Sequence, residues 1–319
     1  MQRVVLDTDL AMGAVGSDID DGFALALALA DPGIALDLVT TVNGNTDVET
    51  ATSLTLELLH RLDRAQVPVH RGATRPLLRP QARSGHLPDG VPVRQPRPGH
   101  AALAMVEHVR EHPGEVTVVA IGPLTNIALA VRLDPDFAPS LKRLVVMGGV
   151  FLGHTHDATM PGEFNLWSDP EAAAIVLDSG VVADFVGLDV TTQVRLDRRQ
   201  ARQMADSGGS FASFAGRCTT AWIEHLASTS TGSVHSCALH DPLAVAAVTQ
   251  DLLTWREAHV QVELGDRLRG AVLADFQDRE SSTEDAGRGG CGSRANARVA
   301  VAVDAQAFTT FFTDKVQQL

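Results

Sequence analysis

Short apolar runs alternate with longer segments of helical periodicity along this chain of 319 residues. The apolar runs predict strands at residues 3–7, 34–42, 67–72, 116–122, 141–149, 182–187 and 297–304. The longer segments predict helices at residues 20–30, 47–62, 99–111, 124–132, 169–178, 197–227, 240–249 and 305–318. Strand–helix alternation is typical of an α/β fold in which helices cover both faces of a mostly parallel sheet. We therefore expect an open, doubly wound, Rossmann-like sheet with extra helices.

Two late apolar runs lie close together, "AHVQVEL" at 258–264 and "LRGAVLADF" at 268–276, and predict a β-hairpin. Residues 73–98, 150–168 and 276–296 are rich in Pro, Gly or polar side chains and are expected to be loops. No internal repeat and no linker-like composition divides the chain, so we expect one domain over residues 1–319.

The charge balance excludes several classes of partner. The net charge is −13 and no basic stripe is present, which argues against nucleic acid as a partner. No run of about 18 apolar residues predicts a membrane span, and the start, "MQRVVLDTDL", lacks the apolar core of a signal peptide. Three cysteines without CxxC spacing argue against a disulfide framework or a zinc framework. We expect a cytoplasmic protein.

Five aspartates cluster around the first expected strand and helix, with no Lys or Arg among them: Asp7, Asp9, Asp18, Asp20 and Asp21. Two carboxylates about 4 Å apart repel by roughly 4 kcal/mol at an effective dielectric near 20. If the fold brings these side chains together, a hard divalent cation would neutralise them, because it takes several oxygen ligands at once. The alternative is a solvated acidic loop with one helix cap. Five aspartates in so short a stretch favour a site.

Unusual polar residues follow the ends of the expected strands. They are Asp7 and Asp9; Asn43 and Asn45 in "TTVNGN"; Thr125 and Asn126 in "AIGPLTN"; Glu163 and Asn165 in "PGEFNLWSDPEAA"; and His240 and Asp241 in "CALHDPLA". Ligands of open α/β sheets bind beyond the carboxyl ends of the strands. These groups therefore predict a single pocket at that edge.

The residue types indicate the chemistry of this pocket. Carboxylates of Asp9, Asp21 and Asp241, with an oxygen of Thr125, form an oxygen-only set that suits Ca²⁺ or Mg²⁺ better than zinc. A metal-bound water beside Asp9 would be a nucleophile with a ready base. His240 is a candidate acid for a leaving group. The amide and carboxyl groups of Asp20, Asn45, Glu163 and Asn165 suit hydrogen bonds to a polyhydroxylated ligand such as a sugar.

An ordered set of motifs resembles the calcium-dependent nucleoside N-ribohydrolases, the inosine–uridine-preferring nucleoside hydrolase family. The blocks are "LDTD…DIDDGFALALA", "VNGN", "GPLTN", "VVMGG", "EFN…DPEAA" and "HDPLA", and the match continues to "LRGAVLAD" and "ARVAVAVD". Together they span nearly the whole chain. The resemblance implies the nucleoside hydrolase fold, a nucleoside substrate, a Ca²⁺ cofactor and a homodimer or homotetramer.

The resemblance also implies roles for single residues. Asp9, Asp21 and Asp241 would bind calcium through carboxylates and Thr125 through its main-chain carbonyl, with Asp9 also the base for the attacking water. Ribose hydroxyls would be held by Asp20, Glu163, Asn165 and Asp241, and Asn45 would lie near the water and the sugar. His240 would face the base as a candidate acid. Carboxylates near the sugar would stabilise an oxocarbenium-like transition state.

Three departures from the family pattern leave the substrate open. Ten residues, Leu10 to Ile19, separate Asp9 from Asp20, where the family has a short link. Asp157 stands six residues before Glu163, where the family often has Asn, so the group at the 5′ position of the substrate is in doubt. The segment before "HDPLA" offers Trp222 as an aromatic contact for the base and contains no tyrosine.

Several of these residues also have a structural reading. Asp20 is a possible helix cap, Asn45 a possible turn residue, and Thr125 a possible helix-start residue. Trp222 is placed as a candidate contact to the base, although a tryptophan on such a helix is more often part of the core. Asp169, followed by Pro170, is expected to cap a helix, and Asp7 to orient its neighbours.

We therefore predict a cytoplasmic N-glycosidase that hydrolyses a ribonucleoside to ribose and a free base. One alternative keeps the fold and the metal but acts on a modified nucleoside or another N-riboside in a specialised pathway. A second alternative is a non-catalytic protein that binds nucleosides or ribose, but Asp9, Asp21 and Asp241 are all present. A substrate panel distinguishes these readings.

Overall fold

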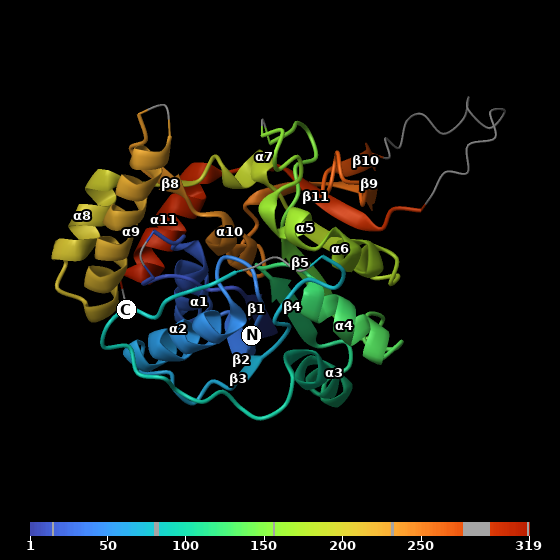
Figure 1. The fold of residues 1–319 in the computed structure, drawn as a ribbon, viewed down its shortest axis with the longest axis horizontal. Coiled ribbons are helices and arrows are strands. Elements are labelled where there is room, and N and C mark those ends of the chain that lie inside the picture. The colour runs from blue at the N-terminus through green and yellow to red at the C-terminus, as the bar shows by residue number, and fades with distance from the viewer. Residues whose placement is uncertain (15, 80–82, 156, 231–232, 277–293, 318) are drawn as a thin grey trace.

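A nine-stranded sheet forms the centre of the computed structural model, which describes residues 1–14, 16–79, 83–155, 157–230, 233–276, 294–317 and 319 (Figure 1). Its strands lie in the order β10-β9-β11-β6-β5-β4-β1-β2-β3. They are β1 (Gln2–Thr8), β2 (Ile34–Thr41), β3 (Val69–Arg71), β4 (Val116–Ala120), β5 (Arg143–Met147), β6 (Ala183–Val186), β9 (Leu253–Val262), β10 (Val272–Phe276) and β11 (Ala297–Val303). The run from β11 to β3 is parallel, whereas β9 pairs antiparallel with both β10 and β11.

Helices cover both faces of the sheet (Figure 1). One face carries α1 (Asp20–Ala30), α2 (Val48–Arg61), α10 (His240–Ala246) and α11 (Ala305–Val316), and the other carries α3 (Ala101–Glu111), α4 (Thr125–Leu133) and α6 (Pro170–Leu177). The hairpin of α8 (Arg198–Asp206) and α9 (Ser210–Thr229) packs at one end of the molecule. The remaining elements are α5 (Phe164–Ser168), α7 (Leu188–Thr191), β7 (Arg195–Asp197) and β8 (Ser236–Ala238).

The first strand shows how the sequence fills the two cores. Val4 and Leu6 belong to the buried cluster beneath α1 and α10, and Val5 belongs to the cluster beneath α3 and α4. All three side chains are fully buried. Successive side chains of a strand point to opposite faces, so an unbroken apolar run is what a doubly covered strand requires.

The order in which the chain adds strands to the sheet reverses between β1 and β4. It leaves β1 for β2 and β3 on one side, then returns to β4, β5 and β6 on the other. This arrangement creates a switch point at the carboxyl ends of β1 and β4, which is where open α/β sheets bind ligands. The end of β1 carries Asp7 and Asp9, so the first acidic residues stand at this point.

The predicted fold class is confirmed, including the late hairpin of β9 and β10. The loop expected over residues 150–168 is wrong at its end, because Phe164–Ser168 form α5, whose N-cap Glu163 accepts hydrogen bonds from the N–H groups of Asn165 and Leu166. The helical region expected over 197–227 is divided between α8 and α9 by Gly208, with φ +81°, and Gly209. The small sheet of β7 and β8 was not predicted.

Some expectations fall partly or wholly outside the described residues. Most of the loop predicted at 276–296 and Cys291 lie there. Cys218 and Cys237, which the structure does describe, are free thiols. Among the described helices, none combines the length and the apolar character needed to cross a bilayer.

Candidate active site

One cavity of about 560 Å³ collects most of the polar residues that the sequence singled out. Its lining includes Asp20, Asn45, Asp157, Glu163, Asn165, Trp222, His240 and Asp241. These residues come from five separate regions of the chain, between the start of α1 and the start of α10. Asp9 and Asp21 are fully buried beside the cavity, where both contact Asn45.

A cluster of buried carboxylates forms the acidic end of this cavity. Ligand oxygens of Asp20, Asp21 and Asp241 lie within 4.8 Å of one another. Asp9 joins them through Asn45, whose N–H donates to Asp9 Oδ2 over 2.6 Å and whose side-chain amide donates to Asp21 Oδ2 over 2.9 Å. The N–H of Asp241 donates to Asp20 Oδ2 over 3.3 Å. Asn45 and the start of α10 therefore hold the carboxylates close to one another.

Two glycines allow the loops after β2 and β4 to approach Asp9. A Cβ on Gly44 would lie 1.9 Å from Asp9 Oδ2, and a Cβ on Gly122 would lie 2.9 Å from Asp9 Oδ1. Neither distance is compatible with a side chain at that position. The glycines of "VNGN" and "IGPLTN" are thus explained by close packing around the carboxylate of Asp9.

The carboxylate cluster carries a large electrostatic cost without a cation. Burial raises the pKa of Asp9 to about 7 and that of Asp20 to about 7, and neighbouring carboxylates add to the shift. Burial and neighbouring carboxylates raise the pKa values of Asp21 and Asp241 well above the ordinary range. Among the described residues, Asp9 Oδ1 is buried and has no hydrogen-bond partner. A hard divalent cation with oxygen ligands fits this set.

Glu163 and Asn165 are held in place by the backbone around them. Glu163 accepts the N–H groups of Gly149, Asn165 and Leu166 over 3.1, 2.9 and 3.2 Å. The amide nitrogen of Asn165 donates to the carbonyls of Ile121 and Met147 over 3.0 and 3.2 Å. Because both of its N–H bonds are used in this way, Asn165 presents its amide oxygen as an acceptor for a ligand hydroxyl.

His240 stands at the first position of α10, next to Asp241. Its Nδ1 lies 2.7 Å from Thr191 Oγ1, which fixes the orientation of the ring. Burial lowers the pKa of His240, and the charge of Asp18 opposes this shift. Asp18 also lines the cavity, and its carboxylate accepts the N–H of Ile19 over 2.7 Å. The structure thus places Asp18, which had no predicted role, beside the candidate acid.

Asp20 is the first residue of α1 and does not cap it. The N-cap position belongs to Ile19, without any side-chain hydrogen bond to the helix. The possible capping role of Asp20 is therefore wrong. Its carboxylate is directed to Asp241 and the cavity instead.

Trp222 and Asp157 line more open parts of the cavity. Trp222 is half-buried and stacks on His225, with ring centroids 5.4 Å apart and planes 13° apart. Asp157 is exposed, and its Oδ1 accepts the N–H and the hydroxyl of Thr159 over 2.8 and 2.7 Å. These hydrogen bonds lower the pKa of Asp157, which keeps a negative charge at this wall.

The side chain of Thr125 bonds to Asp169 and not to the carboxylate cluster. Its hydroxyl donates to Asp169 Oδ2 over 2.7 Å, and the same oxygen accepts the N–H of Leu77 over 2.9 Å. Asp169 also caps α6, with Pro170 in its first turn, as the sequence predicted. Thr125 also lines a separate cavity of about 770 Å³, whose other lining residues include Arg71, Arg75 and Arg97. A metal contact through the Thr125 carbonyl stays a prediction.

Asp7 lies at the end of β1 as an anchor between elements. Its Oδ1 accepts the hydroxyl of Thr40 over 2.6 Å and the side-chain amide of Asn126 over 2.8 Å. Asn126 also accepts the N–H of Ala73 and donates to the carbonyl of Thr41. These contacts agree with the orienting role expected for Asp7.

Sequence reasoning missed Arg83, the only Arg or Lys among the described residues that line the cavity. Its guanidinium carbon lies 5.0 Å from the centre of the Phe164 ring, which also lines the cavity. Burial lowers the pKa of Arg83, and the charge of Asp9 opposes that shift. Arg83 belongs to a Pro- and Arg-rich loop, where no periodicity distinguishes it from the other arginines.

Comparisons with known proteins find one matching family and several similar enzymes. Over residues 4–310 the sequence matches the family described as inosine-uridine preferring nucleoside hydrolase. A non-specific ribonucleoside hydrolase, RihC, from Salmonella enteritidis is 36% identical over 318 residues, which cover 96% of this chain and 94% of the relative. A probable uridine nucleosidase 1 from Oryza sativa subsp. japonica is 33% identical over 284 residues, which cover 86% of this chain and 85% of the relative.

Two solved structures have the same fold. The plant nucleoside hydrolase PpNRh1 superposes with a TM-score of 0.85 at 27% identity, covering 100% of this chain and 99% of its own. A purine-preferring ribonucleoside hydrolase from Gardnerella vaginalis superposes with a TM-score of 0.83 at 26% identity, covering 99% and 98%. The expected nucleoside hydrolase fold is therefore confirmed.

Proposed function

Because this chain belongs to the inosine-uridine preferring nucleoside hydrolase family, we propose that it uses the buried carboxylate cluster to hydrolyse ribonucleosides with calcium as its cofactor. Family membership makes the chain an N-glycosidase. The observation that carries the finer proposal is the convergence of Asp20, Asp21 and Asp241 at the acidic end of a cavity that has room for a nucleoside.

The residues proposed to hold calcium are Asp9, Asp21, Asp241 and the main-chain carbonyl of Thr125. Calcium bound there would supply a coordinated water of lowered pKa as the nucleophile. The unpartnered Oδ1 of Asp9 and the mutual repulsion of the buried carboxylates support a cation at this place. Exclusively oxygen donors favour Ca²⁺ or Mg²⁺ over zinc.

Asp9 is proposed as the general base. Its Oδ2 is engaged by the N–H of Asn45, whereas its buried Oδ1 accepts no hydrogen bond from the described residues, so Oδ1 keeps one lone pair for the cation and one for a proton from the attacking water. Burial raises the pKa of Asp9 in the metal-free protein, and a bound cation would oppose that shift by favouring the charged carboxylate that accepts the proton.

The ribose is proposed to bind between Asp20, Glu163, Asn165 and Asp241. The Asn165 amide oxygen and the carboxylates would accept hydrogen bonds from its hydroxyl groups. As the glycosidic bond breaks, positive charge develops on the sugar ring. Fixed carboxylates nearby stabilise that charge more strongly in a buried site than they would in water.

The base would leave towards His240 and Trp222. The ring of His240 is fixed by Thr191, so it is positioned to give a proton to the departing base. The half-buried ring of Trp222 offers an apolar surface for a planar base. Relatives and neighbours are named for uridine, for purines and for non-specific activity, so their names do not select one base.

A second candidate substrate class, a modified nucleoside or another N-riboside, is favoured by two features of the cavity. Asp157 places a negative charge at its wall, and Arg83 places a positive charge beside Phe164. Charged side chains in the cavity lining suit contacts to polar substituents that an unmodified nucleoside lacks.

The homodimer or homotetramer implied by the resemblance stays a prediction.

A substrate panel tests the function directly. We expect the wild-type protein with calcium to release reducing sugar from at least one of uridine, cytidine, inosine, adenosine and guanosine. Hydrolysis restricted to 5′-modified nucleosides or other N-ribosides would move the second substrate class to the front. Absence of hydrolysis across both panels, with protein that binds calcium, would overturn the proposed activity.

Calcium binding should release protons and tighten as the pH rises. In the metal-free protein, burial and neighbouring carboxylates raise the pKa values of the proposed ligands Asp9, Asp21 and Asp241, and protons held there must leave before these carboxylates bind a cation. The affinity should change by about tenfold per pH unit for each proton released. Calorimetric titration of chelator-treated protein between pH 6 and 8, in two buffers of different ionisation enthalpy, measures both quantities. A pH-independent affinity without proton release would contradict the proposed ligand set.

A further inference from the structure

A second group of metal-ligating side chains lies at the end of α3, apart from the active-site cavity. His108, Glu111 and His112 each offer one ligand atom, and these atoms lie within 4.8 Å of one another. Residues at positions i, i+3 and i+4 of a helix share one face, which explains their convergence. The rings of His108 and His112 meet edge to face, with centroids 5.1 Å apart. None of the three residues lines either cavity described above.

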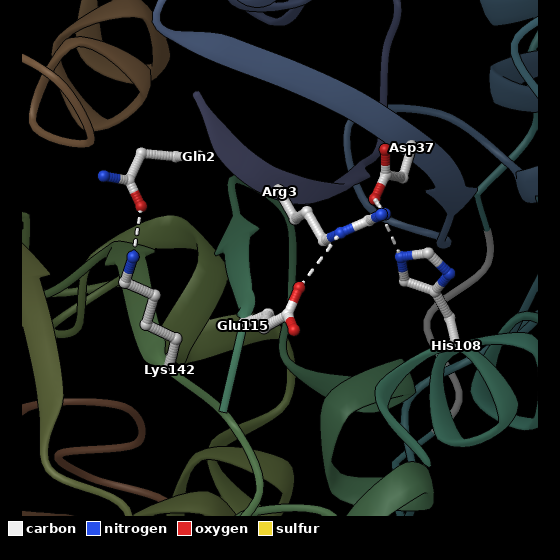
Figure 2. A network of polar contacts seen from close by, with 6 residues as sticks. All are labelled: Gln2, Arg3, Asp37, His108, Glu115 and Lys142. Carbon is white, nitrogen blue, oxygen red and sulfur yellow. Dashed lines mark hydrogen bonds and ion pairs between the residues drawn. The ribbon is translucent and has the colours of Figure 1, made fainter. Parts of the chain in front are cut away.

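A carboxylate from the sheet orients one of these histidines. His108 Nε2 lies 3.2 Å from Asp37 Oδ2, and Asp37 belongs to β2 (Figure 2). A hydrogen bond from Nε2 to a carboxylate leaves the lone pair on Nδ1, and Figure 2 shows that nitrogen turned away from Asp37. Histidines that bind metals generally donate their other ring N–H to a carboxylate, a carbonyl or a water. The hydrogen bond to Asp37 therefore fixes the ring of His108 and leaves Nδ1 as the nitrogen that would bind a metal.

The charges that surround this group are paired with one another. The positive charge of Arg3 is balanced by Asp37 over 2.6 Å and by Glu115 over 3.4 Å, as Figure 2 shows. Glu111 is exposed and brings a negative charge to the group. Neutral imidazoles and one carboxylate are a suitable ligand set for a divalent transition metal.

We propose that His108, Glu111 and His112 bind Zn²⁺ or a similar transition-metal cation at a site distinct from the catalytic carboxylates. Two imidazoles and one carboxylate favour zinc over calcium, whereas the oxygen-only active-site cluster has the opposite preference. The fourth coordination position is left to water, because Glu111 faces solvent. Bound metal would link His108 to His112 across the last turn of α3, immediately before Pro113.

Zinc titration in saturating calcium tests this site, because excess calcium occupies the acidic cluster. Calorimetry of the wild-type protein should give one zinc per chain, and His108→Ala or His112→Ala should weaken binding by at least tenfold. Asp37→Asn should weaken it by about tenfold, since the group that orients a ligand tunes its affinity. His60→Ala removes an exposed histidine from α2 and should leave the affinity unchanged.

Cobalt provides a spectroscopic readout of the same site. Co²⁺ in the wild-type protein should give visible absorption bands of a nitrogen-containing site, and His112→Ala should abolish them while hydrolytic activity is unchanged. Zinc that binds equally well to wild type and to both histidine variants occupies another place and overturns the proposal. Absence of zinc binding to the wild-type protein also overturns it.

Discussion

Asp9→Asn should lower kcat for ribonucleoside hydrolysis by roughly 10²–10⁴-fold, the range expected for loss of a general base. The substitution keeps the shape of the side chain and an acceptor for the Asn45 N–H, which lies 2.6 Å from Asp9 Oδ2. It removes the charge and the second oxygen that would accept the proton. Initial rates of reducing-sugar release, measured over a range of substrate concentrations in excess calcium, separate kcat from KM.

The control for this variant is Asp251→Asn, which removes a carboxylate from an exposed position outside the cavity. It should leave kcat unchanged. The metal-free Asp9→Asn protein should unfold at no lower denaturant concentration than wild type, because burial and the nearby carboxylate of Asp20 destabilise the charged form of Asp9. An Asp9→Asn enzyme with wild-type kcat would remove Asp9 from the proposed mechanism.

The convergence of the candidate site residues could be predicted from the sequence because parallel strands carry their carboxyl ends to one edge of a sheet. Asp9 follows β1 and Asn45 follows β2, and the structure joins them with a hydrogen bond. Asp20 in α1 and Asp241 in α10 are 221 positions apart in sequence, but their carboxylates lie close together because the two helices pack against each other. The order of short motifs thus contained the long-range contacts of the site.

Other features depend on contacts that no local pattern encodes. The three-residue strands β7 and β8 pair Arg195 with Ala238 across a long separation, and neither strand is long enough to show alternation. Arg83 enters the cavity from a loop without periodicity. The hydroxyl of Thr125 is directed to Asp169 by tertiary packing, which the adjacent "GPLTN" block does not specify.

Phe23→Ala should lower the free energy of unfolding by about 3–5 kcal/mol, the usual cost of deleting a buried aromatic ring. Phe23 is fully buried on α1, the helix whose first turn carries Asp20 and Asp21. Its ring packs edge to face against the rings of Phe312 in α11 and Phe211 in α9, with ring centroids 5.2 and 6.1 Å apart. Equilibrium denaturation followed by circular dichroism measures the loss.

Two further variants show whether this ring anchors the acidic end of α1. Phe23→Leu keeps most of the apolar volume and should cost less than about 1.5 kcal/mol. Phe311→Ala removes a half-buried ring from α11 and should also cost less than Phe23→Ala. Because α1 positions Asp20 and Asp21, the folded fraction of Phe23→Ala should also bind calcium more weakly than Phe311→Ala does. Equal stability losses and equal calcium affinities in the two alanine variants would show that the aromatic cluster does not position the carboxylates.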